Sequence, residues 1–398
     1  MIPIAKPVFD EEDLRIIQEP LMNGWVTQGK YVEEFENVFG KFIGIENSIA
    51  VTSCTTALHV IMAGLGIKPG DEVIVPSFTW IATANCVEYM GARPVFVDVN
   101  TTTFNIDVDQ IERNITTNTK AIIPVHLFGL CADMDSVMEI AERHNLSVVE
   151  DAACGFDSWY KGKHAGTMGY SGAFSFHPRK SITTGEGGMV VTSDGKFAEL
   201  MRSLRNHGAS GSDYDRHNKE YSFLLSDYEH LGFNFRMTDI QGALGVSQMK
   251  KAADIMKRKR SFAEMYYDKL KGVEWLQLPF KDDDYIHGYQ SFVCLFKPVE
   301  ITGENMREVS DARNKLMHKL EQKGIMTRQG THSVVHTKYY KDKYGVSDND
   351  CINSLISENC SIALPLYAGM SEEDVEYICN SIREEFEKVY NSNQMTLN

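Results

Sequence analysis

The amino-acid sequence predicts an α/β fold in which helices cover a large, mostly parallel β-sheet, followed by a smaller α+β C-terminal domain. From about residue 48 to residue 193, short runs rich in apolar and β-branched residues alternate with segments of helical periodicity. Several runs are apolar throughout, as in Val73-Ile74-Val75, which is typical of strands buried on both faces. Beyond Gly272 the alternation ends. These observations favour parallel strands joined by right-handed crossovers, with a second unit after them.

The large sheet is expected to contain seven strands. Each is a short β-rich run that is followed by turn-forming or polar residues. Helical spacing between the runs, as in Leu58, Ile61 and Leu65, supplies the covering helices. The expected strands cover residues 48–52, 72–76, 94–99, 120–126, 147–151, 172–176 and 188–193.

A long helical stretch begins near Thr238, where Thr238 and Gln241 form a T-x-x-Q capping box. We interpret residues 241–272 as a helix that links a large domain at 1–240 to a small domain at 273–398. In this interpretation the N-terminal segment is free to pack on the small domain instead of the large one.

Within the linking helix, the basic run at residues 257–260 is interpreted as a solvated helix face rather than an anion site. The small domain is expected to contain one clear strand and two clear helices. Ser371 and Asp374 are expected to cap the last helix. These elements cover residues 288–296, 307–323 and 371–388.

The composition excludes several classes of protein. The 398 residues include 40 Lys and Arg against 55 Asp and Glu, and the net charge of −15 argues against a nucleic-acid partner. No run of about 18 apolar residues is present, so no membrane span is expected. The first seven residues lack the pattern of a secretory signal. The eight Cys form no C-x-x-C pair and have no zinc-like spacing, so we expect reduced thiols, no metal site and a cytoplasmic location.

A candidate phosphate site is present, although the common nucleotide-binding motifs are missing. The expected strand at 48–52 runs into Ser53-Cys54-Thr55-Thr56 and then into a helix. Hydroxyls and free N–H groups at a helix N-terminus can bind an anion. Simple N-capping by Ser53 or Thr55 explains the same residues, so both interpretations stay open here.

Three further residues suggest chemistry. Asp151 ends an expected strand, where it either points into a ligand crevice or caps the next helix. Lys180 lies between an apolar strand and a Gly-rich segment, which suits either a nucleophilic amine or an ordinary surface lysine. Trp80 could stack on a bound ring or pack in the core. A phosphate site, a buried acid and a reactive lysine in this order are the parts that pyridoxal phosphate (PLP) requires.

One block of the sequence is especially specific. Residues 174–188 read F-S-F-H-P-R-K-S-I-T-T-G-E-G-G. Together with four other segments, this block resembles the DegT/DnrJ/EryC1/StrS family of sugar aminotransferases, and the resemblance covers nearly the whole chain. It implies PLP-dependent transferase fold type I, the fold of aspartate aminotransferase. The other segments are residues 52–58, 70–76, 150–153 and 232–241.

The resemblance implies catalytic roles for two residues and a cofactor contact for a third. Lys180 matches the lysine that forms the Schiff base with PLP. Asp151 matches the carboxylate that pairs with the pyridine nitrogen of the cofactor. Trp80 matches the aromatic residue that stacks on the cofactor ring.

The resemblance also implies how the cofactor phosphate is held. Cys54 and Thr55 match the phosphate loop, and Ser175 matches a second phosphate contact. Asn234 matches a residue that reaches the phosphate from the neighbouring subunit. This last role implies a homodimer with shared active sites.

The implied reaction is transfer of an amino group, from L-glutamate as the expected donor, to a nucleotide-linked keto-deoxy sugar. Relatives that dehydrate sugars carry His in place of the lysine, so Lys180 favours transamination. Residues 182–188 read I-T-T-G-E-G-G, the pattern of relatives that act at C4 rather than C3. Two alternatives remain open, namely an aminotransferase that acts on a keto-cyclitol and a PLP-binding regulator without turnover.

The last part of the interpretation concerns substrate contacts. An acidic chain that binds a diphosphate needs local cations, although each candidate could instead form a structural ion pair. The chain departs from the family at Cys154, where Gln or His is common, and in the segment 331–340, which is expected to line the substrate side. The candidate substrate contacts are Arg179, Arg205, His207, Arg236 and His332.

Overall fold

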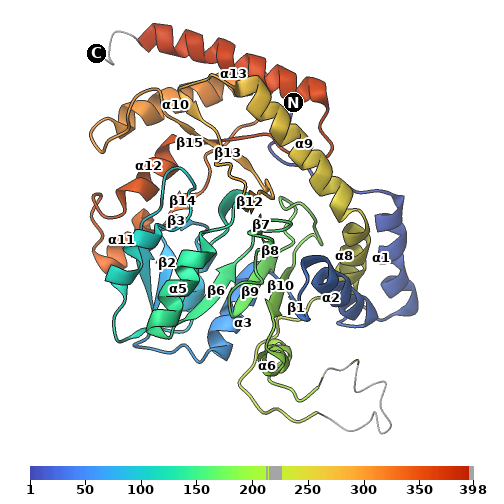
Figure 1. Ribbon diagram of the computed structural model, residues 1–398. Coiled ribbons are helices and arrows are strands. Elements are labelled where there is room, and N and C mark those ends of the chain that lie inside the picture. The colour runs from blue at the N-terminus through green and yellow to red at the C-terminus, as the bar shows by residue number, and fades with distance from the viewer. Residues whose placement is uncertain (212–213, 215–225, 394–398) are drawn as a thin grey trace.

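The large sheet has seven strands and is mostly parallel, as expected (Figure 1). The computed structural model describes residues 1–211, 214 and 226–393. The strand order is β1-β10-β9-β6-β5-β2-β4, and within this sheet β10 runs antiparallel to both of its neighbours. The strands are β1 (Asn47–Val51), β2 (Glu72–Pro76), β4 (Arg93–Val97), β5 (Thr119–Ile122), β6 (Ser147–Asp151), β9 (Ser171–Ser175) and β10 (Gly188–Thr192).

Each face of the sheet has its own apolar core, because successive residues of a strand point to opposite faces. Ile74 of β2 and Ile122 of β5 belong to one core, whereas Val73 and Ala121 belong to the other. Burial on both sides explains why these runs show no alternation of polar and apolar residues. The first core includes residues of α2 (Lys30–Ile43), α5 (Met134–His144) and α8 (Asp239–Lys250), and the second includes residues of α3 (Cys54–Gly64), α4 (Ala82–Glu88) and α6 (Gly195–Arg205).

The strand expected at 120–126 is shorter in the structure, because β5 ends at Ile122. Pro124 has no N–H group and cannot extend the ladder of hydrogen bonds. A 3-10 turn follows at Leu127–Gly129, where Phe128 has a φ of 57°. The prediction was therefore wrong for the last residues of this strand, whereas the other six strands lie within two residues of their expected bounds.

The single linking helix expected after Thr238 is two helices in the structure. α8 and α9 (Ala252–Leu270) meet at Lys251, whose φ of −108° and ψ of 3° interrupt the helix. Thr238 and Gln241 form the predicted capping box at the start of α8. α9 leads to a further apolar core, which the sequence also places after the large sheet. The domain boundaries at 240 and 273 stay a prediction.

The C-terminal part contains the elements that the sequence predicts there. β13 (Phe292–Phe296) lies between β11 (Leu276–Gln277) and β15 (Ser361–Leu364), and α10 (Met306–Gln322) packs on α13 (Glu372–Asn393). The N–H of Ser371 donates to Asp374 and the N–H of Asp374 donates to Ser371, which is the predicted cap. Ile2 pairs with Ile325, so the N-terminal residues contact this part of the chain.

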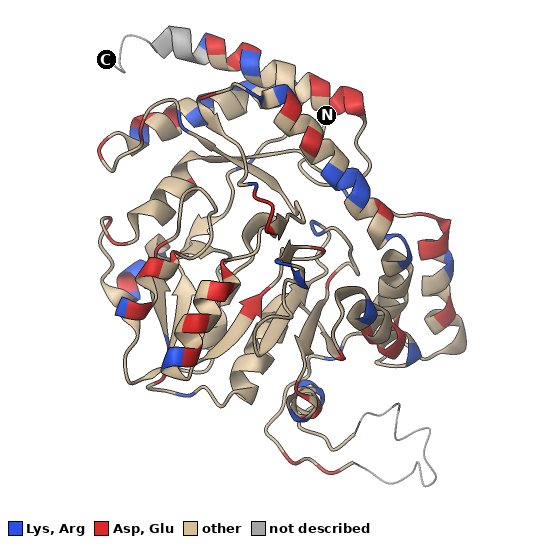
Figure 2. Ribbon diagram, in the orientation of Figure 1, with Lys and Arg blue, Asp and Glu red and all other residues tan. Residues whose placement is uncertain are grey.

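The remaining elements are short or lie at the surface. No helix in residues 1–211, 214 and 226–393 is both long and apolar enough to cross a membrane. Charged residues gather on the outer helices, whereas the strands of the sheet are mainly uncharged (Figure 2). These elements are α1 (Glu11–Asn23), β3 (Phe78–Thr79), β7 (Trp159–Tyr160), β8 (Lys163–His164), β12 (Tyr285–Ile286), β14 (His332–Ser333), α11 (Lys338–Tyr344) and α12 (Ile352–Cys360).

Candidate active site

The residues that the sequence singled out come from one edge of the sheet. β1, β2, β6 and β9 point in the same direction, so their carboxyl ends meet at this edge. Asp151 and Ser175 are the last residues of β6 and β9. Ligands of open α/β sheets bind outside the carboxyl ends of such strands. The topology therefore brings together segments that are more than a hundred residues apart in the sequence.

Asp151 is a buried carboxylate, with 4% of its surface exposed. The hydroxyl of Thr83 donates to Oδ2 at 2.7 Å, and the N–H of Ala153 donates to Oδ1 at 3.1 Å. Burial raises the pKa of Asp151, while these hydrogen bonds act in the opposite direction. The Sγ atom of Cys54 lies 4.0 Å from Oδ1. The carboxylate faces the start of α3, as a partner for a bound cation would.

Lys180 lies in a tight turn after β9, where its N–H donates to the carbonyl of His177 at 2.8 Å. Its Nζ donates to Sγ of Cys154 at 3.2 Å. The departure from the family at position 154 therefore concerns a direct partner of this lysine. A thiol is a weaker acceptor than the amide or imidazole that relatives commonly carry there.

The N-terminus of α3 allows both interpretations of this segment, namely helix capping and anion binding. Ser53 is the N-cap and forms a capping box with Thr56. The first turn of a helix still leaves N–H groups without intrahelical partners, and these include Cys54 and Thr55. Gly188 closes this cradle, because a Cβ atom there would lie 2.3 Å from the carbonyl carbon of Ser53.

Trp80 lies at the mouth of the site and has 56% of its surface exposed. It follows β3, and β3 pairs with β14, which contains His332. The rings of Trp80 and His332 are 5.9 Å apart, and Nδ1 of His332 lies 3.2 Å from Oε1 of Glu358. An exposed Trp at the carboxyl edge of the sheet is not packed in the core, which leaves its face free for a planar ligand.

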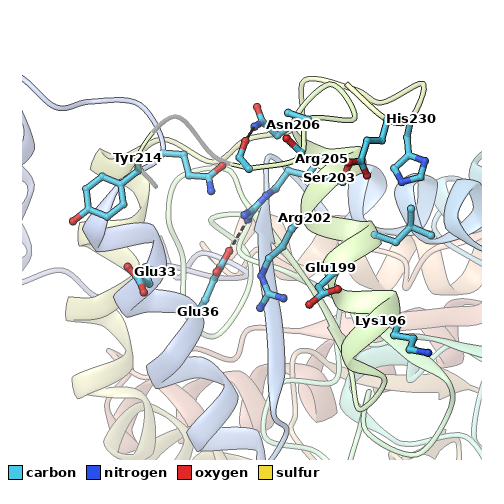
Figure 3. A pocket seen from close by; sticks show the side chains of 17 residues that line it. Glu33, Glu36, Lys196, Glu199, Arg202, Ser203, Arg205, Asn206, Tyr214 and His230 are labelled. Carbon is cyan, nitrogen blue, oxygen red and sulfur yellow. Dashed lines mark hydrogen bonds and ion pairs between the residues drawn. The ribbon is translucent and has the colours of Figure 1, made fainter. Parts of the chain in front are cut away.

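Arg205 is placed away from Lys180 and Asp151. It has 3% of its surface exposed, and its guanidinium forms a 2.5 Å ion pair with Glu36 and donates to the carbonyl of Ala50. It lines a pocket of about 590 Å³ whose lining contains neither Lys180 nor Asp151 (Figure 3). This is the structural ion pair that the sequence left open as the alternative role.

Three other predicted residues lie in adjoining segments near the end of α6. His207 donates its N–H to the carbonyl of Phe233, and Arg236 donates to Oδ1 of Asn206 at 2.7 Å. Asn234 is exposed. The stacked rings of Phe233 and its neighbour Phe235 share one side of this extended segment, so Asn234 points to the other side. The role of Asn234 in a neighbouring subunit stays a prediction.

The sequence interpretation missed three residues near the site. Thr83 is the hydroxyl partner of Asp151. Arg328 is near both Arg179 and Cys154: burial lowers the pKa of Arg328, Arg179 lowers it further, and Cys154 acts in the opposite direction. Thr83 lies on α4, three residues after Trp80, and the segment around Trp80 could have indicated it. No local feature of the sequence indicates Arg328.

The third missed residue, Lys259, corrects the interpretation of the basic run. Lys257 and Arg258 are exposed, as expected for a solvated face. Lys259 is buried, with 3% of its surface exposed. The apolar spacing predicts this, since Lys259 is four residues after Ile255 and four before Ala263. The part of the chain that the structure describes holds no cluster of His, Cys, Asp and Glu suited to a metal ion.

The fold and the comparisons with known proteins define a PLP-dependent aminotransferase. The chain belongs to the DegT/DnrJ/EryC1/StrS aminotransferase family, whose model matches residues 7–383. It is 36% identical to a GDP-perosamine synthase of Caulobacter vibrioides, over 95% of this chain and 96% of the relative. It is 33% identical to the spore coat polysaccharide biosynthesis protein SpsC of Bacillus subtilis, over 96% of each chain.

A solved structure supports the same assignment. The PLP form of the putative sugar aminotransferase Spr1654 from Streptococcus pneumoniae superposes with a TM-score of 0.89 at 26% identity, over 98% of this chain and 99% of that one. The predicted fold, family and cofactor are therefore confirmed. The protein is a sugar aminotransferase that uses PLP.

Proposed function

We propose that this enzyme transfers an amino group from L-glutamate to C4 of a nucleotide-linked keto-deoxy sugar. The observation that carries the proposal is the arrangement at the sheet edge. A buried carboxylate, Asp151, and a lysine amine, Lys180, each lie against a thiol at the same edge, Cys54 and Cys154 respectively. This arrangement offers both an anionic partner for a ring nitrogen and an amine for covalent attachment.

The other predicted residues fit the remaining parts of PLP. The N-terminus of α3, at Cys54 and Thr55, suits the phosphate group because its N–H groups and helix dipole favour an anion. Ser175 adds a hydroxyl at the end of β9. Trp80 offers an exposed ring for stacking. Asn234 is exposed and suits a contact with the phosphate of a second subunit, so we also propose a homodimer with shared active sites.

The bound cofactor supplies an electron sink for the charge that develops at the α-carbon of the amino donor. Asp151 would hold a proton on the ring nitrogen, and its burial would strengthen this ion pair by excluding water. The amine of Lys180 would move a proton between the α-carbon of the donor and the C4′ atom of the cofactor. Cys154 contacts this amine and helps to set its direction.

Other observations favour a sugar position and a nucleotide-linked substrate. The I-T-T-G-E-G-G pattern at residues 182–188 favours C4. The relative called GDP-perosamine synthase supports a nucleotide-linked sugar as substrate. Arg179 and Arg328 are two cations near the site that could bind the diphosphate or the donor carboxylate. His332 beside Trp80 is a candidate contact on the sugar side.

Adding glutamate to the purified yellow protein tests the first half-reaction. The expected result is loss of the visible band and one equivalent of 2-oxoglutarate per site, whereas a binder without turnover would keep its spectrum. UDP-, GDP- and dTDP-linked 4-keto and 3-keto sugars, with inososes beside them, then test the second half-reaction. Amination of an inosose alone would establish the keto-cyclitol alternative and overturn the proposed substrate.

A further inference from the structure

A small cavity lies directly behind Lys180. Its volume is about 10 Å³, close to the space that one water molecule needs. The cavity is lined by the turn that carries Lys180, by α9, by N-terminal residues and by residues 366–368. Besides the exposed Lys6, two lysines line this one cavity, Lys180 and Lys259. The buried amine of Lys259 has no role in the mechanism described above.

Lys259 holds the turn that presents Lys180. Its Nζ donates to Oγ of Ser181 at 3.0 Å and lies 3.5 Å from the carbonyl oxygen of Gln290. The side-chain amide of Gln290 in turn donates to the carbonyl of Arg179 at 3.3 Å. The residues on both sides of Lys180 are therefore fixed to α9 and to the loop before β13.

The described residues provide no acidic partner for the amine of Lys259. Within residues 1–211, 214 and 226–393, no carboxylate forms an ion pair with it at 4.0 Å or less. Its neighbour Arg260 does have one, since it forms a 2.8 Å ion pair with Asp157. A buried cation without a counter-charge is costly, so the uncharged amine is favoured.

The charged and titratable groups around Lys259 also favour the uncharged form of its amine. Burial lowers the pKa of Lys259 to about 7; Lys180 and Arg260 lower it, while Cys154 acts in the opposite direction. His287 also faces Lys259, and burial lowers the pKa of this imidazole to about 3, so it is uncharged near neutral pH. Lys6 and Arg179 line the same cavity and add only positive charge.

We propose that Lys259 is a positioning residue for Lys180: it anchors the turn that presents this lysine, and the two nitrogen atoms share one proton between them. Two positive charges on residues that line one small cavity disfavour each other, so a proton on one amine opposes a proton on the other. When the nitrogen of Lys180 is bonded to a carbonyl carbon it becomes a weaker base than a free amine, and Lys259 then takes a share of the proton.

The inference rests on Lys180 as the residue that carries the cofactor, and borohydride trapping with peptide mapping tests that point separately. If Lys180 stays unlabelled, the proposed function fails. If Lys180 is labelled, the pH titration of the visible absorption band of the holoenzyme tests Lys259 itself. This band reports the proton on the nitrogen of Lys180 and needs no turnover.

Lys259→Met removes the competing amine and keeps an unbranched side chain. We expect the midpoint of the titration to rise by about one pH unit, because the nitrogen of Lys180 then keeps its proton without a cationic neighbour. Lys259→Gln is a second neutral variant, with a polar group for Ser181, and serves if the Met variant does not fold. Lys257→Met is the matched control on the exposed side of the same helix, and its midpoint should equal that of the wild type.

Ser181→Ala separates the anchor from the charge, because it removes the hydrogen bond and leaves the amine of Lys259 in place. Its midpoint should move less than that of Lys259→Met. An unchanged midpoint in both neutral variants would overturn the inference. The charge-sharing part would also fail if Ser181→Ala moved the midpoint as far as Lys259→Met.

Discussion

Two pockets of this protein differ in size and in chemistry. The larger, of about 590 Å³, is lined by charged side chains that include the ion pair of Arg205 with Glu36. The smaller, of about 10 Å³, is lined by Lys180 and Lys259, whose amines face no carboxylate of the cavity lining. The size of a pocket shows where the fold leaves space. Charged side chains without an opposite charge beside them indicate where a ligand is needed. We therefore expect a structural role for Arg205 and a chemical role for the lysine beside the small pocket.

The largest expected effect comes from removing the amine that the small pocket presents. Lys180→Ala should reduce the formation of 2-oxoglutarate from glutamate by at least about a thousandfold, because no other group can attach the cofactor and move the proton. Far-UV circular dichroism should show an intact fold. Lys257→Ala, at an exposed position, is the matched control and should retain activity. Substantial turnover by Lys180→Ala would show that this amine is not needed, and the comparison of the two pockets would lose its basis.

Asp151→Asn should have the next largest effect. The amide keeps the shape and the hydrogen bond to Thr83 but loses the negative charge that holds the ring nitrogen protonated. We expect kcat/KM for glutamate to fall by about a hundredfold or more, at nearly unchanged thermal stability. The measurement is a steady-state assay with a thermal melt beside it.

Asp98→Asn is the matched control for Asp151. Asp98 is also buried, and burial raises its pKa, but it accepts N–H groups of Asn353 and Ser354 and so ties α12 to the end of β4. This control should lower the melting temperature and leave kcat/KM in place. A wild-type rate for Asp151→Asn would show that the ring nitrogen needs no anionic partner in this enzyme.

For Arg205→Met, at the larger pocket, we expect a loss of stability with little loss of activity, which is the opposite of the outcome for Asp151→Asn. This change leaves the carboxylate of Glu36 in a buried position without its cation, which should lower the free energy of unfolding by about 3 kcal/mol. KM for the nucleotide sugar should change less than about twofold. Urea unfolding and steady-state kinetics measure the two effects. Glu36→Gln in the same chain should recover part of the stability, whereas a large rise in KM would return Arg205 to the substrate site.

Much of this arrangement is predictable from the sequence, because strand ends are local features. Asp151 and Ser175 end strands that the apolar runs define, and parallel pairing brings such ends to one edge. Lys180 stands in a block specific enough to indicate the family. The sequence alone could not bring Arg328 to Cys154, because contacts between such distant segments depend on how α9 and the C-terminal part pack against the large sheet.

Lys259 shows a different kind of error. Its position in the apolar stripe of α9 was readable from Ile255 and Ala263, but four basic residues in a row favoured the interpretation of a solvated face. On a helix, four consecutive residues are spread over about 300° around the axis, so they cannot all share one face. A charged residue within an apolar stripe is thus a signal of function, and the composition of the segment alone does not reveal it.

The smallest effect is expected at Cys154, the partner of Lys180 at which the chain departs from the family. Cys154→Gln replaces a weak sulfur acceptor with an amide that can hold the amine of Lys180 more firmly. We expect a shift in the visible absorption of the holoenzyme and a change in kcat of less than about tenfold. Cys351→Ser, at another partly buried thiol, is the control and should leave the spectrum unchanged. If Cys154→Gln also left the spectrum unchanged, the contact between Cys154 and Lys180 would not persist once the lysine carries the cofactor, and charge alone would distinguish the small pocket from the large one.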